Sequence, residues 1–218
     1  MINLPKTYSQ WDKRWKNKLL GFSKRDTIGH YGCLITCQSM IDYYYGFNHK
    51  PDEVNDELKR YSGFAGSLYK WGSFSKVHKS IREIYKRTNY RLKNSDIKAI
   101  KESIDKNYPV MIWLDYNPRT VKNEMHWVLA IDYNKDNEND ITIADPIDGK
   151  TKSMKKYLGW FIPSIRRTIE AYVIYEGKLP DLTNWKKKYE ELLPKYNDLE
   201  KDKDKLEEIV NKIKKIIK

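Results

Sequence analysis

Residues 28–40 decide the fold, because a glycine-containing loop there runs into an apolar helix that begins at a cysteine: Ile28-Gly29-His30-Tyr31-Gly32-Cys33-Leu34-Ile35-Thr36-Cys37-Gln38-Ser39-Met40. Free backbone N–H groups and the positive end of the helix dipole stabilise a thiolate at a helix N-terminus. Cys33 is therefore a candidate nucleophile. A free cysteine can equally be a small buried hydrophobic residue, so the rest of the chain has to decide between the two interpretations.

Length and cysteine content bound the class of protein. The 218 residues suffice for one ordinary domain with a real core and a smaller additional element. The two cysteines lie four residues apart on one predicted helix and make no disulfide framework. The N-terminus lacks a signal-peptide core, and no run approaches the ~20 apolar residues of a membrane span. We therefore expect synthesis in the cytoplasm without a signal peptide and no transmembrane segment.

The chain is strongly basic, with 42 Lys and Arg against 30 Asp and Glu and a net charge of +12. Such a balance favours an anionic partner, which can be nucleic acid, an anionic membrane or a polyanionic cell wall. We find no RNA-binding signature, zinc-finger spacing or phosphate loop, so nucleic acid is the least favoured of these partners. An AT-rich genome would also enrich the chain in lysine, which leaves part of the charge open to a compositional explanation.

The first half of the chain is predicted to be mainly helical. After the helix that starts at Cys33 and ends near Gly46, Pro51 opens a second helix through Leu58. Apolar spacing predicts a third helix over 77–85 and a fourth that runs from a Ser95 cap to residue 104. Glycines and aromatic residues over 62–73 predict a loop.

Four short apolar or β-rich runs follow, at 109–114, 125–131, 141–144 and 171–175, each bounded by turn-forming residues. Helices first and strands second predict an α+β domain, which we place at residues 1–178. The acidic segment 132–140 lacks the central glycine and terminal glutamate of an EF-hand, so we expect a solvated hairpin loop rather than a calcium site.

The remaining residues, 179–218, form a separate helical, coiled-coil-like tail. Apolar residues recur every seven positions in two offset series: Trp185, Leu192, Leu199, Leu206 and Ile213; then Tyr189, Tyr196, Val210 and Ile217, with Lys203 in the same series. Pro194 predicts a break between a short and a longer helix. This apolar seam is consistent with a homo-oligomer that forms through residues 182–218. The polar Lys203 weakens the seam, so the alternative of a tail helix that docks on its own domain stays open.

A cysteine nucleophile needs a base to take its proton. Among the four histidines, His126 alone lies on a predicted strand among apolar neighbours and close after a loop. His30 is three residues from Cys33 but belongs to the preceding loop, where its geometry is open. His49 and His78 fall in polar, solvent-like contexts.

The base in turn needs an orienting group. Asp145 ends the next predicted strand immediately before Pro146, so its carboxylate would emerge beside the His126 strand if the two strands pair as a hairpin. Asp-Pro is also an ordinary turn signal. Asp115 and Asp132 are alternatives, but neither comes with a turn that fixes its direction.

Spaced anchors along the chain resemble papain-like cysteine peptidases of the bacteriocin-processing type, and in particular their stand-alone bacterial and phage members. The resemblance covers residues 5–176 in the family's order. Its anchors are Gln10, Asp12, Trp15, Leu20-Gly21, Gly32-Cys33, Met40, Pro51-Asp52-Glu53-Val54-Asn55, Leu58, His126-Trp127-Val128, Ala144-Asp145-Pro146 and Gly149.

The resemblance implies a papain-like fold, in which a helical half with the nucleophile packs on an antiparallel sheet. It further implies that Cys33 is the nucleophile, His126 the general base and acid, Asp145 the orienting group and Gln10 the side-chain donor of the oxyanion hole. The backbone N–H of Cys33 would be the second donor. No cofactor and no metal is implied.

We therefore predict a cysteine endopeptidase. The basic charge, the tail and the phage-type resemblance favour cell-wall peptide as substrate, with delivery by lysis or within a virion; a protease that processes proteins of its own source is the nearest variant. The absence of a transporter and an ATP-binding domain speaks against leader cleavage coupled to export. Alternatives are a catalytically silent binding or virion-associated structural module and an acyl or amide transferase with the same triad. Specificity is expected in loops 62–73 and 117–124.

Overall fold

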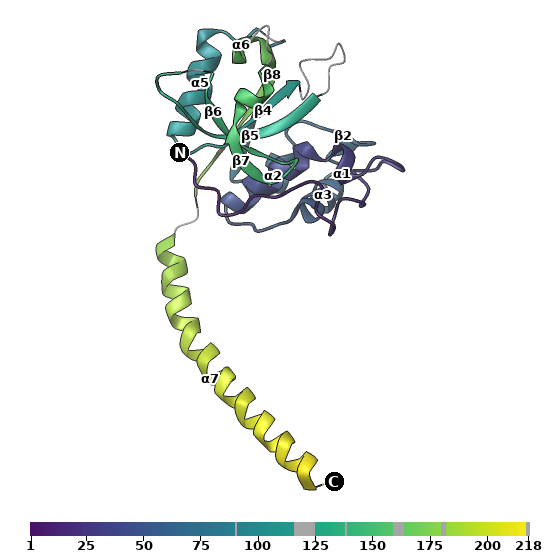
Figure 1. The fold of residues 1–218 in the computed structure, drawn as a ribbon, viewed down its shortest axis with the longest axis vertical. Coiled ribbons are helices and arrows are strands. Elements are labelled where there is room, and N and C mark those ends of the chain that lie inside the picture. Colours follow the sequence, from purple (N-terminus) through teal and green to yellow (C-terminus); the bar gives the residue numbers. More distant parts are fainter. Residues whose placement is uncertain (90, 116–124, 138, 159–163, 180–181, 217–218) are drawn as a thin grey trace. The chain divides into compact units, whose positions relative to one another are not determined.

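The computed structural model describes residues 1–89, 91–115, 125–137, 139–158, 164–179 and 182–216. Contacts within the chain divide it into two units, Met1–Leu179 and Pro180–Lys218. The elements of the first unit, coloured along the chain in Figure 1, are α1 (Ile28–Tyr31), α2 (Cys33–Tyr44), α3 (Pro51–Arg60), β1 (Phe64–Ala65), β2 (Leu68–Tyr69), α4 (Ser73–Val77), β3 (Ile81–Arg87), α5 (Asn94–Asp105), β4 (Val110–Asp115), β5 (Met125–Tyr133), β6 (Ile141–Asp145), β7 (Lys150–Ser153), the 3₁₀ turn η1 (Met154–Tyr157), α6 (Ile165–Thr168) and β8 (Ile169–Gly177).

Helix α2 is the central helix of the first unit, and it starts at Cys33 as predicted. Its apolar residues, among them Ile35, Met40 and Ile41, are buried. Gly32 separates it from α1, and a Cβ at this position would lie 2.5 Å from the carbonyl oxygen of Ile28. Only glycine allows so tight a turn, and this turn places the cysteine at the first position of the helix.

A six-stranded antiparallel sheet of order β3-β8-β4-β5-β6-β7 forms the other half of the unit. Helices cover both of its faces. The hydroxyl of Tyr172 on β8 donates to Asp96 on α5, whereas the amide of Gln38 on α2 donates to the hydroxyl of Tyr175 on the same strand. Residues three apart on a strand point to opposite faces, so α5 and α2 lie on opposite sides of the sheet. The predicted α+β arrangement is confirmed.

The four predicted strands are confirmed as β4, β5, β6 and β8. The helix predicted over 77–85 is wrong. Residues 81–87 form the edge strand β3, and all seven residues pair with β8 in the register from Ile81↔Gly177 to Arg87↔Ala171. The spacing of Ile81, Ile84 and Tyr85 imitates a helical face, but these residue types also favour strands and the distant partner strand decides between the two.

Two further elements differ in detail from the prediction. Helix α5 begins at Asn94 rather than after Ser95, and Asp96 Oδ2 accepts a hydrogen bond of 2.9 Å from the backbone N–H of Lys93. The predicted loop over 62–73 contains the short β1–β2 hairpin. The predicted loop over 117–124 lies outside the described residues.

The second unit is the single helix α7 (Leu182–Ile216). The break predicted at Pro194 is absent, because the helix continues through this residue. A proline removes one backbone hydrogen bond at a cost of about 3 kcal/mol, which the many other bonds of a 35-residue helix can offset. The side chains from 189 to 212 are exposed, including the seam residues Leu192, Tyr196, Leu199, Leu206 and Val210. In the described part of the chain, no helix combines the length and apolar character that crossing a membrane requires.

Candidate active site

Cys33 is half-buried at the start of α2, and its thiol is free, as is that of the buried Cys37. The side chain of His126 and the backbone N–H groups of Trp127 and Leu34 all act to lower the pKa of this thiol. The Leu34 donor belongs to the first turn of α2, where backbone N–H groups have no helical partner. The start of the helix therefore contributes to the lowered pKa of the Cys33 thiol.

His126 is the second residue of β5 and is buried. Its Nε2 lies 2.9 Å from Oδ1 of Asp145, the last residue of the neighbouring strand β6. The antiparallel pairing of β5 and β6 brings together two residues that are 19 positions apart in the sequence.

The electrostatics of the three residues favour a thiolate–imidazolium pair. Burial alone would raise the pKa of Cys33, but the hydrogen bond and the charge of His126 outweigh it and lower the pKa. Burial alone would lower the pKa of His126, but the hydrogen bonds to Asp145 and Cys33 raise it to about 9. Cys37 shows the contrast, because burial raises its pKa well above the ordinary value for a thiol.

Asp145 is completely buried and fully engaged. Its Oδ1 also accepts a hydrogen bond of 3.0 Å from the backbone N–H of Ile147. Its Oδ2 accepts one from the hydroxyl of Tyr157 and one of 3.0 Å from Nζ of Lys152. Although burial acts in the opposite direction, these donors and His126 hold the pKa of Asp145 well below its usual range. The carboxylate therefore stays charged and fixed in direction.

Tyr157 and Lys152 were not predicted from the sequence. Both follow the Asp148-Gly149 turn, on η1 and β7. Asp-Gly is itself a turn signal, but the strand after it is hard to predict because the run Lys150–Ser153 has no apolar residue. A hairpin prediction from the turn alone would have brought Lys152 back toward β6.

Gln10 is buried in the extended N-terminal segment and links the two halves of the site. Its Nε2 donates to the carbonyl oxygen of Gly29, 2.7 Å away on α1. Its backbone N–H donates to the carbonyl oxygen of Pro146, the residue after Asp145. Gly149, with φ of 67°, lets this segment pass close by, since a Cβ there would lie 3.0 Å from the backbone of Tyr8 and Ser9. Among the described residues, the amide nitrogen makes only this one hydrogen bond, and its Oε1 is buried without a partner.

A groove of about 250 Å³ opens beside Cys33. Its wall is largely aromatic and apolar, with Trp113 and Trp127 from adjacent strands and Leu68 and Tyr69 from the 62–73 segment. The two indole rings stack with centroids 5.5 Å apart. A larger hollow of about 440 Å³ lies elsewhere, around Arg82 and Gly177, and contains none of the predicted site residues.

The other candidate residues have different surroundings. His30 is exposed and packs edge-on against Trp11, and Asp132 lies 3.6 Å from the terminal amino group of Met1. Asp115 ends β4 opposite Met125. The solvent-like context predicted for His78 is wrong, since it is buried against Phe74 and pairs with Asp42.

Comparisons with known proteins identify the family of the chain. A search of curated protein sequences finds no significant match. A candidate C39-like peptidase from Bacillus anthracis, known from its crystal structure, is 14% identical, with a TM-score of 0.47, over 68% of this chain and 90% of that one. Residues 6–171 match the family model described as the C39-like peptidase family. The chain therefore belongs to the C39-like peptidase family.

Proposed function

We propose that this chain is a cysteine peptidase that hydrolyses amide bonds through a Cys33–His126–Asp145 triad. The observation that carries the proposal is the buried contact of 2.9 Å between the imidazole of His126 and the carboxylate of Asp145, together with the effect of His126 on the Cys33 thiol. The pKa of the thiol is lowered and that of the imidazole is raised to about 9. Such opposite shifts prepare both groups for catalysis near neutral pH.

The proposed reaction uses these residues in turn. The Cys33 thiolate attacks the carbonyl carbon, and the oxyanion is stabilised by the free amide N–H of Gln10 and by the backbone N–H of Cys33. The imidazolium of His126 then gives its proton to the amine nitrogen as the C–N bond breaks, which leaves a thioester. His126 next takes a proton from water, and the resulting hydroxide attacks the thioester carbon. The C–S bond then breaks, which releases the acid product and restores the Cys33 thiolate.

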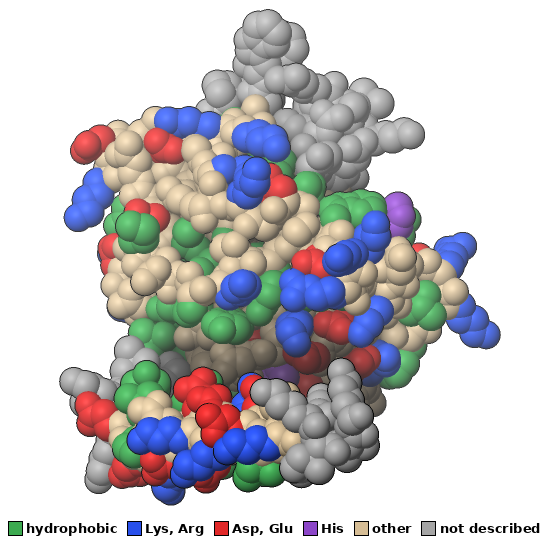
Figure 2. All heavy atoms as spheres, turned by 60° about the horizontal axis from the view of Figure 1, so that its bottom comes forward, with side chains coloured by type: hydrophobic (Ala, Val, Ile, Leu, Met, Phe, Trp, Pro, Cys, Tyr) green, Lys and Arg blue, Asp and Glu red, His purple; other side chains and the backbone are tan. Residues whose placement is uncertain are grey.

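Peptide of the bacterial cell wall is the substrate class that we favour. The net charge of +12 attracts a polyanionic wall over a long range. On the face drawn in Figure 2, lysine and arginine side chains are mixed with acidic ones. The aromatic groove beside Cys33 offers apolar contact, and the buried indole N–H of Trp113 has no acceptor among the described residues and can donate to a substrate carbonyl.

The test is digestion of purified Gram-positive and Gram-negative peptidoglycan, beside a peptide library derived from bacterial proteins. The wild type is compared with Cys33→Ala and with the matched control Cys37→Ala, and new amino termini are read by mass spectrometry. We expect new termini with the wild type and Cys37→Ala and none with Cys33→Ala. Cleavage confined to the library would exclude the wall as substrate. No cleavage of either material by the wild type would contradict the peptidase proposal.

A further inference from the structure

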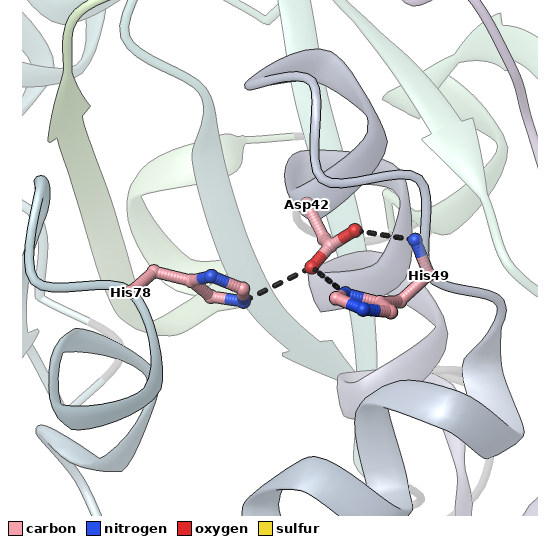
Figure 3. A group of neighbouring side chains, drawn as sticks. All are labelled: Asp42, His49 and His78. Carbon is pink, nitrogen blue, oxygen red and sulfur yellow. Dashed lines mark hydrogen bonds and ion pairs between the residues drawn. The ribbon is translucent and has the colours of Figure 1, made fainter.

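Three side chains outside the catalytic site converge on one point near the C-terminal end of α2. Asp42 is fully buried on α2, and its Oδ2 lies 3.0 Å from Nδ1 of His49 and 3.0 Å from Nε2 of His78. The three donor atoms all lie within 4.8 Å of one another. Figure 3 shows the two imidazole rings directed at the same carboxylate oxygen.

The surroundings hold each of these side chains in place. The other oxygen of Asp42 accepts a hydrogen bond of 2.7 Å from the backbone N–H of His49, and the hydroxyl of Ser39 donates to the His49 carbonyl at 2.7 Å. The His78 ring packs between Phe47 and Phe74, with centroid separations of 4.2 and 4.6 Å. Contacts of this kind, which orient a ligand without touching the metal, are typical of metal sites.

The charge balance of the cluster also indicates a cation. Asp42 pairs with no lysine or arginine in the part of the chain that the structure describes, although its carboxylate has no exposure to water. A buried carboxylate without a positive partner is costly. A bound cation would compensate its charge, and each imidazole would supply a lone pair after moving its proton to its other ring nitrogen.

We propose that Asp42, His49 and His78 bind a zinc ion that stabilises the domain. Imidazole nitrogen and carboxylate oxygen are zinc ligands, whereas calcium and magnesium prefer all-oxygen sites. Tetrahedral ligands at ~2.0–2.2 Å from zinc are ~3.3–3.5 Å apart. The two pairs now at 3.0 Å need to separate by a few tenths of an ångström, and the two imidazole nitrogens, which lie within 4.8 Å, need to approach by at most about 1.3 Å. The His49 side chain is 36% exposed, which leaves room for water as the fourth ligand.

The ion would act on stability rather than on the reaction. Asp42 lies nine residues after Cys33 on α2, which corresponds to roughly 13 Å along the helix axis. The metal would join α2 to the segment before α3 and to the end of α4. Because such a site forms only in the folded chain, zinc binding would raise the melting temperature.

The test uses the full chain with Cys33→Ala, so that zinc cannot bind the catalytic thiol. Metal-free protein is titrated with zinc chloride, and zinc content is measured by mass spectrometry together with the melting temperature. His49→Gln is introduced in this background, and His30→Gln, which changes an exposed histidine outside the cluster, is the matched control. We expect one zinc per chain and a higher melting temperature, with at least a tenfold weaker affinity in His49→Gln and no change in His30→Gln.

Equal zinc binding by both variants, or no zinc binding by the parent, would overturn the proposal and indicate that the cluster is only hydrogen-bonded. Circular dichroism establishes whether His49→Gln is folded. If it is not, the visible spectrum of the parent with cobalt(II) decides instead. A tetrahedral nitrogen and oxygen spectrum supports the site, and the spectrum of hexaaqua cobalt overturns it.

Discussion

The substitution Asp145→Asn tests how the charge of the triad is stabilised. The contact of 2.9 Å between Asp145 and His126 is buried and joins an anion to an imidazolium. Hydrogen bonds to charged groups contribute about 1.5–3 kcal/mol. One pKa unit corresponds to about 1.36 kcal/mol, so the loss of the carboxylate charge is expected to lower the pKa of His126 by about 1–2 units.

The assay is an NMR titration of labelled histidine in the wild type and the variant, with the signal of His126 assigned from His126→Ala. We expect a midpoint near the value of about 9 in the wild type and one roughly 1–2 units lower in Asp145→Asn. The sign follows from the raised pKa: the imidazolium persists below the midpoint and is lost as the pH rises through it. The variant therefore begins to lose its catalytic acid at a lower pH.

Asp148→Asn is the matched control for this substitution. Asp148 shares Lys152 with Asp145, with a contact of 2.6 Å to its Nζ, and the contacts that the structure describes for it do not include His126. The control should leave the His126 midpoint unchanged. An unchanged midpoint in Asp145→Asn, with the variant folded by circular dichroism, would refute the reasoning that this carboxylate holds the imidazolium.

Three further predictions concern other parts of the chain. Gln10→Ala should lower kcat roughly 10²–10³-fold through loss of an oxyanion donor while iodoacetamide still alkylates the thiol at the wild-type rate; a parallel loss of alkylation would mean that the site has collapsed. Tyr157→Phe should lower the free energy of unfolding by about 1.5–3 kcal/mol at pH 7. The depressed pKa of Asp145 contributes stability that is lost in acid. The free energy of unfolding of Tyr157→Phe, measured with urea, should therefore begin to fall at a higher pH than that of the wild type, and an unchanged dependence on pH would exclude a role of Tyr157 in stabilising the Asp145 carboxylate. Leu199→Asp on the exposed seam of α7 should convert an oligomer to a monomer by light scattering, whereas Lys201→Asp on the opposite face should not; a monomeric wild type would contradict the seam prediction.

The parts of the fold that local pattern determines could be predicted from the sequence. The α2 helix from Cys33 and the strand that carries His126 have a clear period or a continuous apolar run. The adjacency of His126 and Asp145 followed from two consecutive strands with a short connection. In each case the relevant contacts lie close in sequence or repeat at the period of the element.

The parts that distant contacts determine could not be predicted. Strand β3 has a helix-like spacing, and its identity comes from pairing with β8, about 90 residues later. The burial of His78 comes from Asp42, 36 residues earlier. Tyr157 reaches Asp145 only because β7 turns back on β6. The Asp148-Gly149 turn is a local signal for the return of β7, whereas no local signal reports the pairing of β3 with β8.

The most direct test of the central claim is proteolysis of a peptide library in water enriched in ¹⁸O. The full chain is compared with Cys33→Ala, and each new carboxyl terminus is examined by mass spectrometry for the heavy isotope. A hydrolase that works through a Cys33 thioester predicts new termini that depend on Cys33 and that carry ¹⁸O, because water resolves the thioester. Cysteine-dependent products without the isotope would indicate transfer to another acceptor, and new termini formed equally by Cys33→Ala would contradict the assignment of Cys33 as the nucleophile.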